Sequence, residues 1–275
     1  NNCSFDGQYL VGSQDDGAGA REIVVWDIVN GPVTVHVAPS NKDLRKFVSD
    51  DGGIVVATID SGGTVLMWVR STADPTTGTA VYVGGSDYRL IGCSSDCTVL
   101  LLEKPLVDPA SEIYLWTKNA LDNDGTFTLI GASANWRSAS DDSEYRNNPI
   151  SADGTTVLMI KQQPISGDRE AFRWTALTGS VSISANDELM LVLNEDGSVV
   201  TGAVTDLSAN DSDDMPTWNT EDDVVYYPTP TGYNVRSVEG EGFLRLPRMS
   251  RDGFTIGGNL IDPITDDVVP FILGG

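Results

Sequence analysis

Short runs of apolar and β-branched residues alternate with clusters of Gly, Asp, Ser and Thr along the whole chain. One run, Val157 to Ile160, follows a Ser-x-Asp-Gly tetrapeptide that begins at Ser151, and a second run closes on Trp174. Ser and Asp side chains accept hydrogen bonds from nearby backbone amides, and Gly154 tolerates a positive φ. The pattern therefore predicts two adjacent antiparallel strands joined by a tight turn.

The same unit recurs six times, with its turn aspartates spaced by 45, 45, 57, 43 and 56 residues. Ser or Asn stands two residues before each aspartate, an apolar residue precedes it, an aliphatic residue follows four positions after the aspartate, and an aromatic residue ends the second run. The same residue types at the same positions in all six copies indicate an internal repeat. The aspartates are Asp6, Asp51, Asp96, Asp153, Asp196 and Asp252, and the aromatic residues are Trp26, Trp68, Trp116, Trp174, Trp218 and Phe271. We expect the six aromatic residues to be core wedges between blades.

Each full period of about 45 residues holds four strand-like runs, as β-propeller blades do. We expect an all-β protein, a six-bladed β-propeller with about four antiparallel strands per blade, in a single domain over 1–275. Incomplete terminal blades are expected: either residues 1–4 form a stub inner strand beside a short last blade, or upstream chain completes the ring. The repeats lie near 1–43, 44–87, 88–146, 147–187, 188–241 and 242–275.

The fourth copy resembles the bacterial extracellular repeats called HAF repeats, which couple a Ser-x-Asp-Gly turn to an Ala-Phe-x-Trp strand. Ala171 to Trp174 match that strand motif fully. More loosely, the unit is similar to the Pro-Asp-Gly repeats of TolB-like propellers. The fifth and sixth copies depart from the motif, with Met215 to Trp218 and Val269 to Phe271 in its place. The resemblance implies a propeller architecture and export, to the cell surface, the extracellular space or the periplasm, and it carries over no catalytic residue.

The formal net charge is −23, from 40 acidic and 17 basic residues. Binding to nucleic acid depends on Lys and Arg neutralising phosphates, so we expect no nucleic-acid partner. Apolar runs are short and interrupted, so no membrane insertion is expected. The acidic surface either keeps the protein soluble in a salty or extracellular setting or forms a face for cations or a basic partner.

The three cysteines occupy informative positions in the repeat. Cys3 and Cys93 stand in the apolar position before the turn, where each serves as a small buried hydrophobic residue. Cys97 replaces the turn glycine, so Cys93 and Cys97 flank a three-residue turn at a separation that suits a disulfide. The sequence leaves this bridge open, and its presence would imply an oxidising compartment.

Two long periods contain insertions, over 131–148 and 228–242, that we expect on the edge of the propeller opposite to the Ser-x-Asp-Gly turns. Exposed loops on a rigid scaffold are where binding sites are usually built. Aromatic residues beside arginines can stack on a sugar ring or anchor a protein partner. Alternatively, the first insertion folds over the next blade with its tryptophan as a plug. The candidate binding residues are Trp136, Arg137, Tyr145, Arg146, Tyr233 and Arg236.

Acidic residues are frequent in the loops expected at the same edge. Asp211, Asp213 and Asp214 alternate as in calcium-binding loops, although the glycine and distal glutamate of an EF-hand are missing, so Ca²⁺ is a weak candidate ligand. The only histidine, His36, lies in an alternating strand pattern and builds no triad or zinc cluster.

The sequence therefore favours an exported, non-catalytic binding, adhesion or surface-assembly module with a glycan, surface polymer or protein partner. The alternative is a carbohydrate-active hydrolase or lyase that uses carboxylates on the long-loop face.

Overall fold

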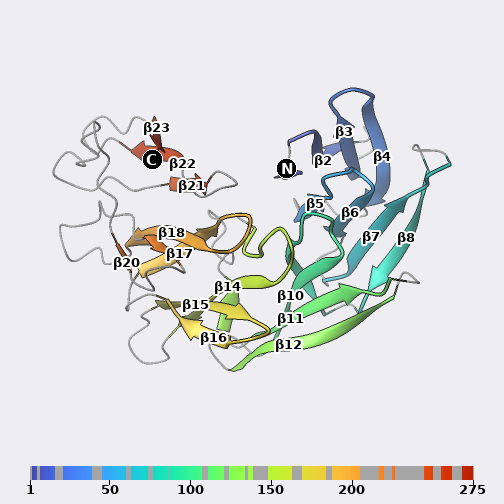
Figure 1. The fold of residues 1–275 in the computed structure, drawn as a ribbon. Helices are drawn as coiled ribbons and strands as arrows, with labels where there is room; N and C mark the ends of the chain where they lie inside the picture. The colour runs from blue at the N-terminus through green and yellow to red at the C-terminus, as the bar shows by residue number, and fades with distance from the viewer. Residues whose placement is uncertain are drawn as a thin grey trace. The chain divides into compact units, whose positions relative to one another are not determined.

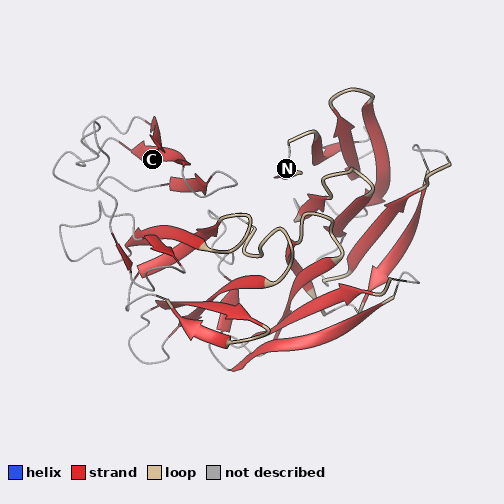
Figure 2. Ribbon diagram, viewed as in Figure 1, coloured by secondary structure: helices blue, strands red, loops and turns tan. Residues whose placement is uncertain are grey.

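The computed structural model contains only β-strands as regular secondary structure among the residues it describes (Figure 2). None of these residues belongs to a helix able to span a membrane. The chain divides into two compact units, Asn1–Ala132 with Ala152–Gly154, and Ser133–Ser151 with Thr155–Gly275. The described residues are 2–4, 7–15, 21–38, 45–59, 63–73, 77–85, 87–106, 111–120, 124–133, 136–138, 148–162, 169–183, 188–204, 217–219, 225–226, 245–249, 255–261 and 268–274.

The first unit holds three four-stranded sheets, in each of which consecutive strands lie side by side (Figure 1). Every strand pair with a described register in this unit is antiparallel. The strands are β1 (Asn2–Cys3), β2 (Tyr9–Asp15), β3 (Arg21–Asp27) and β4 (Gly31–Ala38); β5 (Lys46–Val48), β6 (Ile54–Thr58), β7 (Val65–Arg70) and β8 (Gly78–Val83); and β9 (Arg89–Cys93), β10 (Val99–Pro105), β11 (Ser111–Lys118) and β12 (Gly125–Ser133).

The second unit holds, within its described residues, two further four-stranded sheets and a sheet of three strands. The same consecutive antiparallel order holds in these sheets. The strands are β13 (Trp136–Ser138), β14 (Thr156–Gln162), β15 (Arg169–Thr175) and β16 (Gly179–Ser182); β17 (Glu188–Leu193), β18 (Val199–Val204), β19 (Thr217–Asn219) and β20 (Val225–Tyr226); and β21 (Arg245–Met249), β22 (Thr255–Ile261) and β23 (Val268–Gly274).

A short strand begins the first sheet, which is compatible with both alternatives for the terminal blades. Asn2 pairs with Val11 and Cys3 pairs with Leu10, so β1 is a two-residue edge strand of the first sheet. The described part of the last sheet has three strands. The repeat therefore gives four strands in five of these sheets and a stub strand at the beginning of the first.

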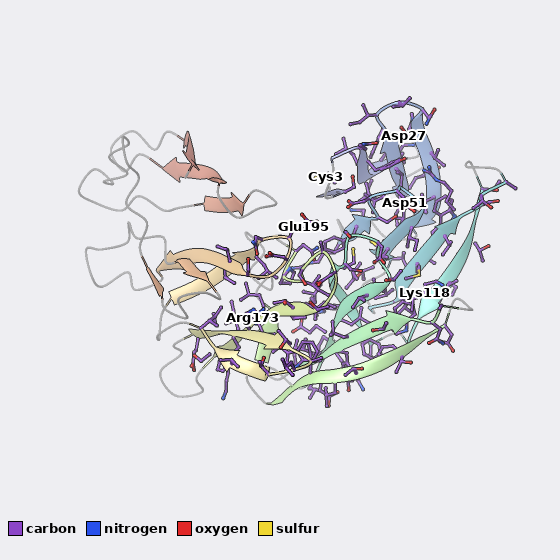
Figure 3. The ribbon with its side chains drawn as sticks, in the orientation of Figure 1. Cys3, Asp27, Asp51, Lys118, Arg173 and Glu195 are labelled. Carbon is purple, nitrogen blue, oxygen red and sulfur yellow. The ribbon has the colours of Figure 1, made fainter. Side chains whose placement is uncertain are left out.

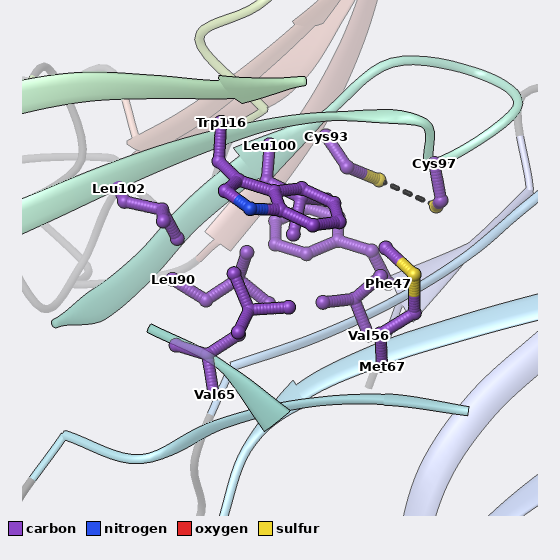
Figure 4. Close-up of a cluster of buried hydrophobic side chains, with 11 residues drawn as sticks. Phe47, Val56, Val65, Met67, Leu90, Cys93, Cys97, Leu100, Leu102 and Trp116 are labelled. Atoms are coloured by element: carbon purple, nitrogen blue, oxygen red, sulfur yellow. Dashed lines mark hydrogen bonds between the residues drawn. The ribbon is translucent and has the colours of Figure 1, made fainter. Parts of the chain in front are cut away.

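Both faces of the second sheet are buried. Alternate side chains of a strand point to opposite faces, so neighbouring residues of one strand pack into two different clusters. Val55 and Leu66 belong to one buried cluster with side chains of the first sheet. Val56 and Met67, one position along in each strand, belong to another cluster with side chains of the third sheet (Figure 4). Central strands buried on two faces read as continuous apolar runs, which explains the sequence of β6 and β7.

The aromatic residue that ends the second run is a core side chain in the second and third sheets. Trp68 and Trp116 are both buried. A Cβ atom on Gly78 would lie 2.3 Å from the Trp68 ring, and one on Gly125 would lie 2.2 Å from the Trp116 ring. The next strand therefore needs glycine opposite each indole. Truncating a buried Trp to Ala typically destabilises a protein by about 3 to 5 kcal/mol.

The expectation that all six aromatic residues are core wedges is confirmed for Trp68 and Trp116 only. Trp26 and Trp174 are partly buried. The side chains of Trp218 and Phe271 lie outside the described residues, so their packing stays a prediction.

Candidate functional site

The Ser-x-Asp-Gly turns lie at one end of the strands in each sheet, and they have a constant length. In four consecutive sheets, five residues lie between the last paired residue before the turn and the first residue of the strand that follows it. These residues are 49–53, 94–98, 151–155 and 194–198. Such constancy shows that these turns are part of the scaffold.

Side-chain hydrogen bonds hold each turn, as the sequence predicts. In the second sheet, the Ser49 hydroxyl accepts from the Ile54 N–H at 2.8 Å and donates to Asp51 Oδ1 at 2.7 Å. The Gly53 N–H donates to the same carboxylate at 2.8 Å. Figure 3 labels Asp51 at this turn. Asn194 replaces the serine in the fifth sheet, where its Oδ1 accepts from the Val199 N–H at 2.9 Å.

These bonds favour the charged form of the turn aspartates. Burial opposes ionisation of Asp96, but hydrogen bonds from the Ser94 hydroxyl and the Thr98 N–H prevail, and the pKa of Asp96 is lowered. Hydrogen bonds from Ser198 lower the pKa of Asp196 in the same way. Because these carboxylates accept hydrogen bonds from residues of their own turn, their role is structural.

Backbone hydrogen bonds connect successive turns of the first unit. The N–H of Asp50 donates to the carbonyl oxygen of Ser95 at 2.8 Å, and the N–H of Ser95 donates to the carbonyl oxygen of Ala152 at 2.7 Å. All three residues occupy the variable position between the Ser and the Asp of their turns. We call this pair of bonds the turn relay.

The turn glycines also contact the strand of the preceding repeat. A Cβ atom on Gly52 would lie 2.4 Å from the Tyr9 ring, and one on Gly154 would lie 2.7 Å from Cβ of Val99. Both glycines have positive φ, 65° and 74°. Glycine is therefore required here for its backbone conformation and for space.

The opposite end of the fourth sheet carries part of the predicted binding site. Trp136 pairs with Lys161 and Arg137 pairs with Ile160, on the edge strand β13. Lys161 in turn pairs with Glu170 of β15. Because β14 begins at the turn and ends at Gln162, this row lies at the end of the sheet away from the turn.

The prediction of a loop insertion over 131–148 is wrong at its beginning. Residues 131–133 belong to β12, and Trp136–Ser138 form β13. Ser138 pairs with Met159, and Ile150 pairs with Val157. On β14, only Leu158 lies between these two paired positions. In the sequence, 139–149 lie between the paired residues Ser138 and Ile150. The seven-residue β14 therefore pairs with residues that precede this segment in the sequence, Trp136–Ser138, and with one that follows it, Ile150.

The remaining predicted ligand-binding residues lie outside the described part of the chain. This holds for Tyr145, Arg146, Tyr233 and Arg236, and for the calcium candidates Asp211, Asp213 and Asp214. The described residues contain no group of three or more His, Cys, Asp or Glu side chains that could hold a metal ion. His36 pairs with Ile23 across β3 and β4, as expected for a strand residue.

Cys93 and Cys97 lie together, as the position of the two residues in the repeat predicts. Their sulfur atoms are 2.7 Å apart, and both side chains are buried. Cys97 has φ of 53°, in the left-handed region that its glycine counterparts also adopt. No disulfide joins them in this structure. Cys3 is exposed, so the expectation that it is a buried hydrophobic residue is wrong, whereas the same expectation is confirmed for Cys93.

Two contacts of the scaffold carry no signal in the repeat pattern. Tyr88, Tyr114 and Phe127 form an aromatic cluster with ring centroids 5.1 to 6.2 Å apart. Burial and a hydrogen bond to Glu112 raise the pKa of Tyr114 to about 12. Arg173 donates through Nε to the Gly197 carbonyl at 3.0 Å. Arg173 stands at the variable position of the HAF-like strand motif, so the motif gave no signal for it.

The chain has the fold of known β-propellers. The β-propeller domain of the Trilobed protease from Pyrococcus furiosus has a TM-score of 0.66 at 11% identity over 100% of this chain and 80% of that one. Putative TolB from Agrobacterium tumefaciens scores 0.53 at 15% identity, covering 96% and 86% of the two chains. TolB from Acinetobacter baumannii scores 0.53 at 13% identity, covering 99% and 64%. No protein-family model and no curated protein sequence matches the chain.

These likenesses establish an all-β fold of the β-propeller type and leave the function open. The matched structures include the β-propeller domain of a protease and TolB proteins. One scaffold hosts many functions, and the function of this chain has to be argued from its own site.

Proposed function

We propose that this protein is an exported, non-catalytic six-bladed propeller that binds a glycan, a surface polymer or a protein through the turn-distal end of its fourth sheet. Five four-stranded sheets and one three-stranded sheet among the described residues support six blades. The HAF-like fourth copy supports an extracellular or cell-surface location, with the periplasm as the alternative.

One observation carries the proposed site. The edge strand β13 contains Trp136 and Arg137, two of the six candidate residues. In the sequence, Tyr145 and Arg146 lie between this strand and Ile150, the next residue that pairs with β14. Trp, Tyr and Arg are the residue types enriched where proteins bind partners.

The neighbouring strands add charge to the same end of the sheet. The register brings Lys161 and Glu170 into the row of Trp136. The Glu170 carboxylate accepts a hydrogen bond from the Ser182 hydroxyl at 2.5 Å, which fixes its orientation. A row of paired residues that combines an aromatic residue with charged residues suits hydroxyl-rich or peptide ligands.

The test is a binding screen with the whole chain against a glycan array, surface polysaccharides and surface-protein extracts. We expect Trp136→Ala and Arg137→Ala each to weaken a detected interaction at least tenfold. Tyr82→Ala, at an exposed tyrosine on β8, is the matched control and should bind as the unaltered protein does. Thermal unfolding of each variant checks that the fold is intact.

The carbohydrate-active alternative is decided in the same screen by assaying hydrolysis and elimination. Turnover that a single carboxylate substitution abolishes would replace the binding proposal with the enzymatic one. Binding that survives both Trp136→Ala and Arg137→Ala would place the ligand elsewhere and overturn the proposed site. Absence of both binding and turnover across the screen would favour a structural role.

A further inference from the structure

The third turn contains two buried thiols in direct contact. Cys93 ends β9 and Cys97 lies in the turn that follows, and their sulfur atoms approach to 2.7 Å (Figure 4). A disulfide bond is about 2.05 Å long, so a shift of a few tenths of an ångström by each side chain would bring the two sulfurs to bonding distance. The side chains therefore already point toward one another.

This turn departs from the repeat at two positions that face each other. Val48, Ile150 and Leu193 occupy the position of Cys93 in the neighbouring copies. Gly52, Gly154 and Gly197 occupy the position of Cys97, with φ of 65°, 74° and 74°. The first turn has Cys3 in the apolar position but retains Gly7, with φ of 74°. Both cysteines occur together only in the third turn.

Cys97 is unfavourable as a simple substitute for glycine. Its φ of 53° lies in the left-handed region, which costs a residue with a Cβ atom about 1 to 2 kcal/mol. Among the described residues it is the one residue other than glycine with positive φ. A covalent bond to the facing residue offsets this cost, whereas an unbonded thiol does not.

We propose that Cys93 and Cys97 form an intraturn disulfide, made by thiol–disulfide exchange with a low-molecular-weight or protein disulfide while the chain folds. One Cys sulfur attacks the oxidant and releases one thiol. The second Cys sulfur then displaces the other thiol, so two cysteine thiols are oxidised and one disulfide of the oxidant is reduced to two thiols.

The burial of the pair accounts for the timing. Burial and the nearby Cys93 raise the pKa of the Cys97 thiol well above its usual range. Only the thiolate is the nucleophile, so exchange in the folded protein is slow and the bond forms before the turn closes. The same burial keeps reductants from the finished bond.

The bond would lock the centre of the turn relay. Ser95 lies between the two cysteines in the chain, and it supplies both the carbonyl oxygen that accepts from Asp50 and the N–H that donates to Ala152. A bridge from Cys93 to Cys97 closes a short ring around Ser95. The disulfide therefore fixes the residue that connects three consecutive turns.

The first experiment measures the redox state directly. The protein is refolded with oxidised glutathione, alkylated under denaturing conditions and digested with trypsin. Both cysteines stay in one peptide, which begins after Arg89 and continues past Lys104 because Pro105 blocks cleavage. We expect this peptide to be two hydrogens lighter than its reduced form and unalkylated, with the peptide of Cys3 alkylated. Alkylation of both turn cysteines, or a bridge to Cys3, would overturn the proposal.

The second experiment replaces Cys97 with glycine, the residue that the other turns have at this position, and compares oxidised with reduced protein. Cys97→Gly should shift the thermal midpoint several degrees lower in oxidised protein than it does in reduced protein, because only the oxidised protein loses the bridge. In fully reduced protein the same variant should leave the midpoint unchanged or raise it, because glycine removes the left-handed cost. Cys3→Ser should change neither state. An equal effect of Cys97→Gly in both states would contradict the bridge.

Discussion

Arg173 of β15 reaches the turn of the following sheet, where its Nε donates to the carbonyl oxygen of Gly197 at 3.0 Å. A second nitrogen, Nη2, lies 3.4 Å from the Thr156 hydroxyl. Burial lowers the pKa of Arg173 while the Asp196 charge acts to raise it. The guanidinium thus joins two consecutive repeats within the second unit.

Replacing this arginine should weaken that connection. Met67 holds the corresponding position in the second sheet, so Arg173→Met keeps an unbranched side chain and removes the donors. We expect a loss of about 1 to 3 kcal/mol, because the Gly197 carbonyl loses a charged partner. Urea unfolding measures it, with Arg89→Met, at an exposed arginine of β9, as the control. Equal midpoints for both variants would show that the contact contributes nothing.

The first residue of the turn should accept asparagine but reject alanine. Ser151 is fully buried, and its hydroxyl accepts from the N–H of Thr156 at 3.0 Å. Ser151→Ala leaves that amide without its side-chain acceptor and should destabilise the protein by about 1 to 3 kcal/mol. Ser151→Asn should restore most of the loss, because Asn194 makes the same bond in the fifth sheet. Chemical unfolding of the two variants side by side gives the answer, and asparagine as damaging as alanine would contradict this account.

Two glycines with similar backbone conformation should differ in their tolerance of alanine. Gly154 has φ of 74°, and its Cβ atom would lie 2.7 Å from Val99. Gly179 has φ of 65° with nothing within 4 Å of the same position. Gly179→Ala should therefore cost about 1 to 2 kcal/mol from the backbone alone. Gly154→Ala adds steric overlap and should cost about 3 to 5 kcal/mol. Calorimetric midpoints compare them, and equal shifts would mean that the Val99 contact relaxes freely.

Stability should fall in acid as the turn aspartates become protonated. The folded pKa of Asp96 is lowered from its ordinary value of 3.8, so its contribution to stability is present above that value. The contribution is lost as pH falls through the lowered pKa. Asp96→Asn should therefore be less stable than the unaltered protein at neutral pH and should converge with it near about pH 2. Urea midpoints across this range test the sign, and a constant gap between the two curves would contradict it.

The repeat made much of the fold predictable. The Ser-x-Asp-Gly columns predict the turn, its length and its hydrogen bonds, because Ser, Asp and Gly are chosen there by local chemistry. The continuous apolar runs that contain Val55 and Leu66 are predicted as strands, and the structure adds that both faces of the second sheet are buried. The predicted features depend on residues close together in the chain.

The candidate site was less predictable because its position depends on long-range pairing. Trp136 and Arg137 read as loop residues, and only the register against Ile160 and Lys161 makes them part of an edge strand. The aromatic cluster of Tyr88, Tyr114 and Phe127 joins residues from three strands that share no motif. Arg173 occupies a position that the repeat leaves free.

The turn relay explains why one position of the repeat varies so widely. Phe5, Asp50, Ser95, Ala152, Glu195 and Arg251 occupy it in the six copies. Where the relay is described, its hydrogen bonds join peptide groups alone, so they require no particular side chain at this position. Every copy nevertheless retains an N–H, which the proline of a Pro-Asp-Gly turn lacks. The linkage would therefore survive substitution by any amino acid except an imino acid, which leaves this site free to diversify among duplicated repeats.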